Sequence, residues 1–279
     1  MKFLRTIRLS RPRFWIYELG TYALGVCAGL SVGGNISFFY IAFYAFFFLF
    51  PANLLIYGIN DVFDYETDRL NPKKTGYEDL LEPSLHGVVY RNIFLSSITF
   101  IVVGFFIPIY AFIALLFFYF FAFFYSAPPI RAKARPFFDS FFSAGHYVVT
   151  GVFGYYLTGA SGSVVLGVFA GMCWAIAMHA YSAVPDIDAD KESGIRTIAI
   201  SLGKKLTIVL CGFLYALASL VVYTYFSYIV FILALPYVLL MFLSYNADEQ
   251  KLFRLYTYFP KINSLVGMTL FFLVLFRAL

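Results

Sequence analysis

Long apolar runs joined by short connections dominate this sequence. A helix of about 20 apolar residues crosses the hydrocarbon core of a bilayer. The chain of 279 residues is 62% hydrophobic and 13% charged, and hydropathy divides it into nine such runs: 14–34, 38–60, 91–108, 110–126, 137–158, 164–185, 206–225, 228–245 and 259–278. These runs leave no room for a soluble domain. We therefore expect a single all-helical membrane domain over residues 1–279.

Charged residues alternate along the chain with the predicted spans. The connections at 31–37, 107–111, 158–163 and 224–229 contain none, whereas the other connections contain clusters of Lys and Arg. Loops rich in Lys and Arg remain on the cytoplasmic side of a membrane. We expect the N-terminus and all acidic loops to face the cytoplasm from the cell membrane. This distribution favours membrane lipids as neighbours and argues against a nucleic-acid partner.

The first acidic segment follows the second run and contains Asn60, Asp61, Asp64 and Asp68. If the helix continues through it, Asn60, Asp64 and Asp68 lie on one side at spacings of four residues, with Asp61 beside them. Neighbouring carboxylates repel one another, and a hard divalent cation removes that repulsion. Mg²⁺ binds one or two protein carboxylates together with phosphate oxygens. The segment therefore predicts a magnesium site.

The second acidic segment follows the sixth run. Asp186 and Asp190 share one side of a helix, while Asp188 points away and is expected to be solvated. Two such segments could hold one diphosphate between two Mg²⁺ ions. Each segment could instead be a solvated helix end. Two segments of the same kind, each after an apolar run and each followed by cations, favour the ligand interpretation.

Several cations lie beside these segments in the sequence or in a third loop that is expected on the same face of the membrane. They are candidate diphosphate contacts, although ion pairs between loops and lipid headgroups are alternative roles. Arg131 and Lys133 belong to a proline-containing loop between the fourth and fifth runs, and the others lie beside the acidic segments: Arg69, Lys73, Lys74, Lys191 and Arg196.

The motifs resemble those of the UbiA superfamily of intramembrane prenyltransferases over nearly the whole chain. Asn60, Asp61, Asp64 and Asp68 match its NDxxDxxxD motif, the pair Asp186 and Asp190 matches the end of its second motif, and the stretch 125–133 is similar to its tyrosine, proline and basic loop. The resemblance implies nine helices around a central cavity and two Mg²⁺ ions on a prenyl diphosphate. It also implies that Tyr125 contacts the diphosphate.

The second motif departs from the family pattern upstream of Asp186. His179 and Ser182 stand where many members have Asp and Tyr, which argues against a quinone-type acceptor. The stretches 68–74 and 179–186 are similar to those of lycopene elongases. That resemblance implies dimethylallyl diphosphate (DMAPP) as donor and the terminal double bond of lycopene as acceptor, with addition of water in many members. A quinone precursor, chlorophyllide or a glycerol lipid are alternative acceptors.

Three residues are candidate catalytic groups: Asp68, His179 and Tyr181. His179 could take a proton from the prenylated cation or orient a water molecule, and a buried, hydrogen-bonded histidine is an equal alternative. A transporter would require inverted repeats, for which the sequence offers no convincing pair. No protein partner is expected.

Overall fold

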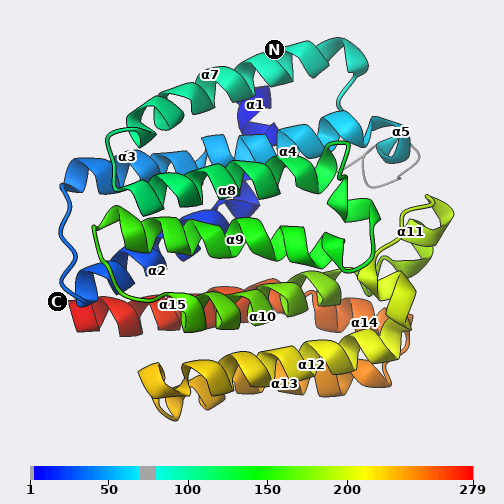
Figure 1. Ribbon diagram of the computed structural model, residues 1–279. Helices are drawn as coiled ribbons and strands as arrows, with labels where there is room; N and C mark the ends of the chain where they lie inside the picture. Colours follow the sequence, from blue (N-terminus) through cyan, green and yellow to red (C-terminus); the bar gives the residue numbers. More distant parts are fainter. Residues whose placement is uncertain (1–2, 70–79, 279) are drawn as a thin grey trace. The chain divides into compact units, whose positions relative to one another are not determined.

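The computed structural model describes residues 3–69 and 80–278. Every regular element in these residues is a helix, as expected for a chain that satisfies its backbone hydrogen bonds inside a bilayer (Figure 1). The elements are α1 (Phe3–Leu9), η1 (Pro12–Phe14), α2 (Trp15–Ser31), α3 (Phe38–Leu49), α4 (Pro51–Phe63), α5 (Tyr65–Asp68), η2 (Pro83–Leu85), α7 (His86–Gly104), α8 (Ile109–Ser126), η3 (Ala132–Ala134), α9 (Phe138–Leu157), α10 (Val165–Ser182), α11 (Ile187–Glu192), α12 (Ile198–Phe226), α13 (Ile229–Tyr245), α14 (Glu249–Tyr256) and α15 (Phe259–Ala278).

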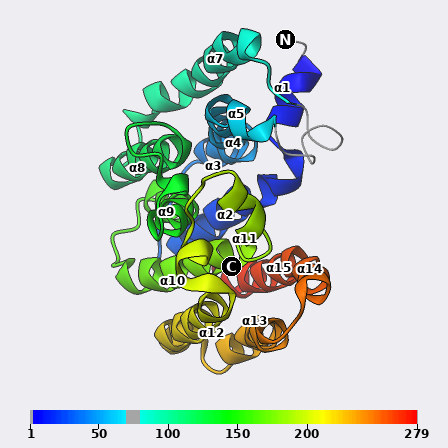
Figure 2. The same cartoon turned by 90° about the vertical axis from the view of Figure 1, so that its right-hand side faces the viewer.

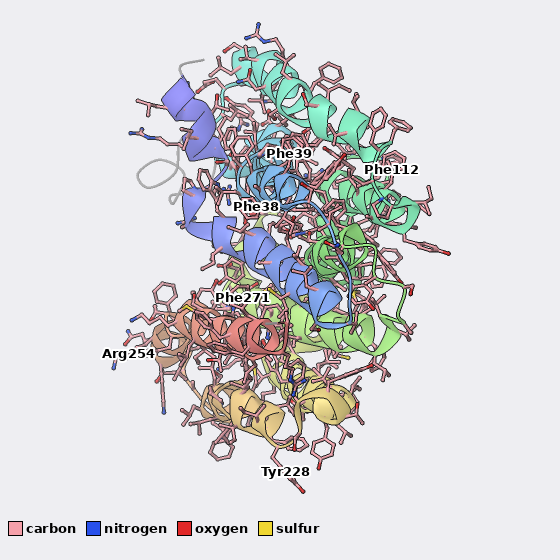
Figure 3. The ribbon with its side chains drawn as sticks, turned by 90° about the vertical axis from the view of Figure 1, so that its left-hand side faces the viewer. Phe38, Phe39, Phe112, Tyr228, Arg254 and Phe271 are labelled. Carbon is pink, nitrogen blue, oxygen red and sulfur yellow. The ribbon has the colours of Figure 1, made fainter. Side chains whose placement is uncertain are left out.

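Many of these helices have the length and apolar surface of membrane spans. Among the described residues, six stretches are long and apolar enough to cross a membrane: Phe38–Phe63, Pro83–Gly104, Ile109–Ser126, Val165–Ser182, Ile198–Phe226 and Glu249–Ala278. Large apolar side chains such as Phe38 and Tyr228, labelled in Figure 3, are 78% and 70% exposed, as expected for contacts with lipid. Each of the nine expected ranges overlaps a helix, but the number of crossings stays a prediction.

The described helices form two compact units. Unit 1 comprises residues 1–131, 149–161 and 274–279, and unit 2 comprises residues 132–148 and 162–273. In unit 1, α4 packs against α3, α7 and α8, around a largely aromatic core that includes Tyr44, Phe47, Phe48, Phe118 and Phe153. In unit 2, α12 packs against both α10 and α13 (Figure 2).

The second apolar run is interrupted at Pro51, where a single helix was expected. Proline has no N–H and cannot continue the helical hydrogen bonds, so α3 ends at Leu49 and α4 begins at Pro51. The Asn53 amide donates to the Phe48 and Leu49 carbonyls at 2.9 and 3.1 Å. Carbonyls left without a partner in a bilayer would be costly. Asn53 therefore supports the break between the two helices.

The seventh run also differs from its expected extent. The helix was expected over 206–225, but α12 already begins at Ile198 and contains a break at Gly203, with φ 73° and ψ 164°. Glycine accommodates a positive φ because it has no Cβ. The break separates a short N-terminal piece, which directly follows the second acidic segment, from the long apolar part of α12.

Glycines bring α2 and the second half of α9 into close contact within unit 1. A Cβ added to Gly25 would collide with the Gly151 carbonyl oxygen, and one added to Gly154 would collide with the Tyr22 carbonyl oxygen. Small residues let membrane helices approach backbone to backbone, where van der Waals packing replaces the hydrophobic driving force available in water. This contact fixes α2 beside α9.

The variant Gly25→Ala tests this contact. The added methyl group must push the two backbones apart, and we expect a loss of about 1–3 kcal/mol in stability, measured as a lower thermal midpoint in detergent. Gly20→Ala is the matched control on the same helix, because no atom lies within 4 Å of its added Cβ. Equal midpoints for the two variants would contradict the close approach.

Candidate active site

The first acidic segment lies in unit 1, where α4 ends and α5 begins. Asp64 follows Phe63 with φ −103° and ψ 2°, so the helix does not run uninterrupted through this segment. The hydrogen bonds nevertheless keep helical spacing, because the Asp64 N–H donates to the Asn60 carbonyl at 3.0 Å and the Asp68 N–H donates to the Asp64 carbonyl at 2.7 Å. Asn60, Asp64 and Asp68 therefore still follow one another at intervals of about one turn.

Two arginines face the buried carboxylates of this segment. Asp61 and Asp64 are each 4% exposed. The Arg11 guanidinium lies 2.8 Å from Asp61 Oδ1, and the Arg131 guanidinium lies 3.8 Å from Asp64 Oδ1. A buried carboxylate requires a nearby positive charge or hydrogen-bond donors to remain ionised. The structure thus brings Arg131, an expected diphosphate contact, beside the predicted metal ligands.

Arg11 was not identified from the sequence. It is 50 residues from Asp61 along the chain, and its side chain also lies over the Tyr57 ring, with 4.8 Å between Cζ and the ring centroid. The sequence signal was the basic N-terminal arm, which predicted membrane orientation and nothing more. Charge alone does not indicate which of several basic residues reaches a distant carboxylate.

Asn60 is oriented by the end of α8. Its amide Nδ2 donates to Ser126 Oγ at 3.2 Å, and Ser126 is fully buried. The amide oxygen, which a metal ion would use, therefore points away from Ser126. Tyr125, an expected diphosphate contact, directly precedes Ser126 in α8 and is half-buried. After Arg11, Ser126 is the second residue in contact with the first acidic segment that sequence reasoning missed.

The second acidic segment lies in unit 2, between α10 and α12. α10 ends at Ser182, and Asp186 precedes the short helix α11. The Asp190 N–H donates to the Asp186 carbonyl at 2.8 Å, so the predicted spacing of these two residues is present. Asp188 is 78% exposed and lies 3.6 Å from Lys191 Nζ. Asp188 is therefore exposed to solvent, as the sequence predicted.

A buried carboxylate anchors the helix that follows this segment. Asp139, in the first turn of α9, is fully buried and accepts a hydrogen bond of 2.8 Å from the Ile198 N–H at the start of α12. The first N–H groups of a helix have no partner within the helix, and a carboxylate there satisfies one and complements the helix dipole. Arg196, an expected diphosphate contact, lies exposed two residues earlier. Sequence reasoning also missed Asp139.

The candidate catalytic residues of α10 lie in different surroundings. His179 Nδ1 is 3.1 Å from Ser140 Oγ, and the residue is half-buried. Tyr181 is fully buried, with its hydroxyl 2.9 Å from Ser244 Oγ and its ring against Phe259. Tyr181 thus lies in the packing of unit 2, whereas His179 is less enclosed. A catalytic role for either residue stays a prediction.

The other expected diphosphate contacts are more dispersed. Arg69 Nε lies 3.1 Å from Glu66 Oε2, and both side chains are exposed. Lys133 lies in η3 of unit 2 and is half-buried. Lys73 and Lys74 lie outside the described residues.

The metal ligands also stay a prediction. Within residues 3–69 and 80–278, no three His, Cys, Asp or Glu side chains lie close enough together to hold a metal ion. Mg²⁺ needs only one or two protein carboxylates when water and phosphate complete its octahedral shell. The hard oxygen donors of Asn60, Asp64 and Asp68 suit that ion.

The family assignment rests on comparison with known proteins. The model of the UbiA prenyltransferase family matches residues 19–274. The chain belongs to the UbiA prenyltransferase family. The resemblance inferred from the motifs is confirmed, and the protein is an integral membrane prenyltransferase.

Similar proteins agree with this assignment. The chain is 37% identical to a lycopene elongase/hydratase of Haloferax volcanii over 93% of its own length and 85% of that protein. It is 35% identical to a lycopene elongase/hydratase of Corynebacterium glutamicum over 80% of its own length and 78% of that protein. A UbiA homolog from Archaeoglobus fulgidus bound to GPP and Mg²⁺ has the same fold, with a TM-score of 0.71, 20% identity, and coverage of 97% of this chain and 99% of that one.

A double-mutant cycle tests the ion pair between Arg11 and Asp61 of this prenyltransferase. Arg11→Gln removes the cation that lies 2.8 Å from the buried Asp61 carboxylate, so we expect a lower thermal midpoint in detergent. Arg11→Gln combined with Asp61→Asn should lose less than the sum of the two single variants, with a coupling of about 1–3 kcal/mol. Arg5→Gln, which changes another arginine near the N-terminus, one that donates to the Leu80 carbonyl, should show no coupling to Asp61→Asn. Purely additive effects of Arg11→Gln and Asp61→Asn would contradict the ion pair.

Proposed function

We propose that this prenyltransferase transfers the prenyl group of a prenyl diphosphate, DMAPP, to the terminal double bond of a carotenoid such as lycopene. The similarity to lycopene elongase/hydratases over 93% of the chain carries the choice of acceptor. A UbiA homolog from Archaeoglobus fulgidus bound to DMAPP and Mg²⁺ shares the fold and supports the choice of donor, with a TM-score of 0.69 and 22% identity.

The two acidic segments are the proposed metal sites. Asn60, Asp64 and Asp68 would hold one Mg²⁺, Asp186 and Asp190 would hold a second, and the two ions would supply positive charge for the leaving diphosphate. The spacing of one turn within each segment supports this assignment. Asp61 belongs to the same set, and its pairing with Arg11 would hold the first segment in place.

The proposed diphosphate contacts are the cations of the three polar loops, with a tyrosine. Arg131 has the strongest support because it lies 3.8 Å from Asp64, and an arginine can donate two parallel hydrogen bonds to a phosphate. The other proposed diphosphate contacts are Arg69, Lys73, Lys74, Tyr125, Lys133, Lys191 and Arg196.

The reaction needs charge stabilisation at the diphosphate and exclusion of water from the prenyl group. When bound, Mg²⁺ stabilises the charge that develops on the diphosphate as the C–O bond breaks. The apolar helices keep water from the allylic cation until the acceptor double bond attacks it. Asp68, at the end of the first acidic segment, would act beside the leaving group.

We further propose one domain of nine spans, with the N-terminus and both acidic segments at the cytoplasmic face of the cell membrane. The connections between α2 and α3, α7 and α8, α9 and α10, and α12 and α13 support this orientation, because they contain no charged residue. Connections of that kind are expected on the outer side.

Substitution of the acidic residues tests the metal sites. Asp64→Asn and Asp186→Asn should each lower magnesium-dependent transfer from labelled DMAPP about 100-fold or more, because each removes a carboxylate that binds the metal. Asp188→Asn is the matched control, since its exposed side chain faces Lys191, and it should keep near-normal activity. Full activity of Asp64→Asn or Asp186→Asn would contradict the metal assignment.

Pigment analysis tests the acceptor. A host that accumulates lycopene and expresses this protein should produce carotenoids enlarged by one or two five-carbon units, measured by mass spectrometry, and the Asp64→Asn variant should not. Unchanged lycopene, together with prenylation of a quinone precursor, chlorophyllide or a glycerol lipid, would show that the acceptor is not a carotenoid. The prenyltransferase activity itself would remain supported.

A further inference from the structure

We propose that His179, held by Ser140, is the base that ends the reaction by accepting the last proton. This inference rests on the proposed function and deepens it. It assigns His179 as a catalytic residue and Ser140 as the residue that positions it. Both belong to unit 2, and their contact joins the first turn of α9 to the last turn of α10.

Ser140 occupies a firmly held position. It is fully buried, and the preceding residue, Asp139, accepts a hydrogen bond of 2.8 Å from the Ile198 N–H of α12. The Ser140 hydroxyl lies 3.1 Å from His179 Nδ1. A partner at Nδ1 fixes the rotation of the ring, so proton transfer runs through the opposite nitrogen, Nε2. A hydroxyl both donates and accepts, so Ser140 suits both the neutral and the protonated ring.

His179 lies at the end of α10 that leads into the second acidic segment. It precedes Asp186 by seven residues, and α10 ends at Ser182 between the two. A prenyl diphosphate held at Asp186 and Asp190 directs its apolar tail toward the membrane-spanning part of the helix. The reacting carbons therefore lie on the same side of the diphosphate as His179.

The accessibility of His179 separates it from its neighbours on α10. Met178, Ala180 and Tyr181 are buried, and Tyr181 is enclosed by Ser244 and Phe259. His179 is half-buried. Of the two predicted catalytic residues on this turn, His179 is thus the less enclosed one.

The chemical step balances without an oxidant or a reductant. The diphosphate leaves with the C–O bonding electrons, and the terminal double bond of the acceptor attacks the allylic cation, which forms a C–C bond and a new tertiary cation. A water molecule then forms a C–O bond and loses a proton to His179 Nε2, which gives an alcohol. Without water, a neighbouring C–H bond becomes the second bond of an alkene, and the same nitrogen takes that proton. His179 therefore takes the last proton in either route, and its position relative to the water molecule and to the C–H bond sets which product forms.

A purely structural role is the competing explanation, in which the contact only ties α9 to α10. Loss of such a tie would lower stability and total activity together and leave the proportion of products unchanged. The ratio of hydrated to unhydrated product therefore distinguishes the two roles, because only a base acts after the C–C bond has formed.

The experiment uses the purified full chain with labelled DMAPP, lycopene and Mg²⁺. His179→Gln and Ser140→Ala are compared with Ser143→Ala, which removes another buried hydroxyl one turn further along α9. We expect the product ratio to change about tenfold or more in His179→Gln, consistent with loss of general-base catalysis. It should change in the same direction in Ser140→Ala, while Ser143→Ala and Ser140→Thr keep the wild-type ratio. If the wild-type protein forms only the hydrated or only the unhydrated product, appearance of the second product in the variants counts as the expected change in ratio.

Product ratios that stay constant in both His179→Gln and Ser140→Ala would overturn this inference and leave the proposed function intact. If His179→Gln fails to fold, the comparison of Ser140→Ala with Ser140→Thr decides between the two roles. A wild-type protein that transfers no prenyl group to lycopene would overturn the proposed function, and this inference with it.

Discussion

Carboxylates buried at the end of an apolar helix require positive charge nearby, and this requirement organises the first acidic segment. Asp61 and Asp64 are each 4% exposed, and the free energy of leaving two such ions uncompensated would be several kcal/mol. Arg11 and Arg131 supply two of the compensating charges. They come from segments far apart in the sequence, so the acidic segment also joins the N-terminal arm to the loop after α8.

The same requirement connects structure to function. Arg131 is a long, flexible cation at 3.8 Å from Asp64 and 42% exposed, a distance that permits electrostatic attraction without a tight hydrogen bond. In the proposed function, Asp64 would hold a Mg²⁺ ion that neutralises its charge, which would leave Arg131 available to the diphosphate. Arg11, at 2.8 Å from Asp61, has the closer contact and suits a fixed structural role.

Sequence reasoning predicted the fold where the signal was local. Hydropathy indicated the positions of the helices, and the sequence intervals placed Asn60, Asp64 and Asp68 one turn apart. It missed contacts between distant residues, because Asn60 and Ser126 are 66 residues apart and Asp139 and Ile198 are 59 apart. The break at Pro51 was visible in principle, since proline cannot continue a helix, but the amide of Asn53 that supports it was not.

The central claim is that the two acidic segments each bind a divalent ion on one prenyl diphosphate. The most direct test is a crystal structure of the protein with Mn²⁺ and an unreactive analogue of DMAPP, in which anomalous scattering locates the metal. The account predicts one peak at Asn60, Asp64 and Asp68, a second at Asp186 and Asp190, and a diphosphate bound to both ions. A bound diphosphate with no Mn²⁺ peak at either segment would contradict it.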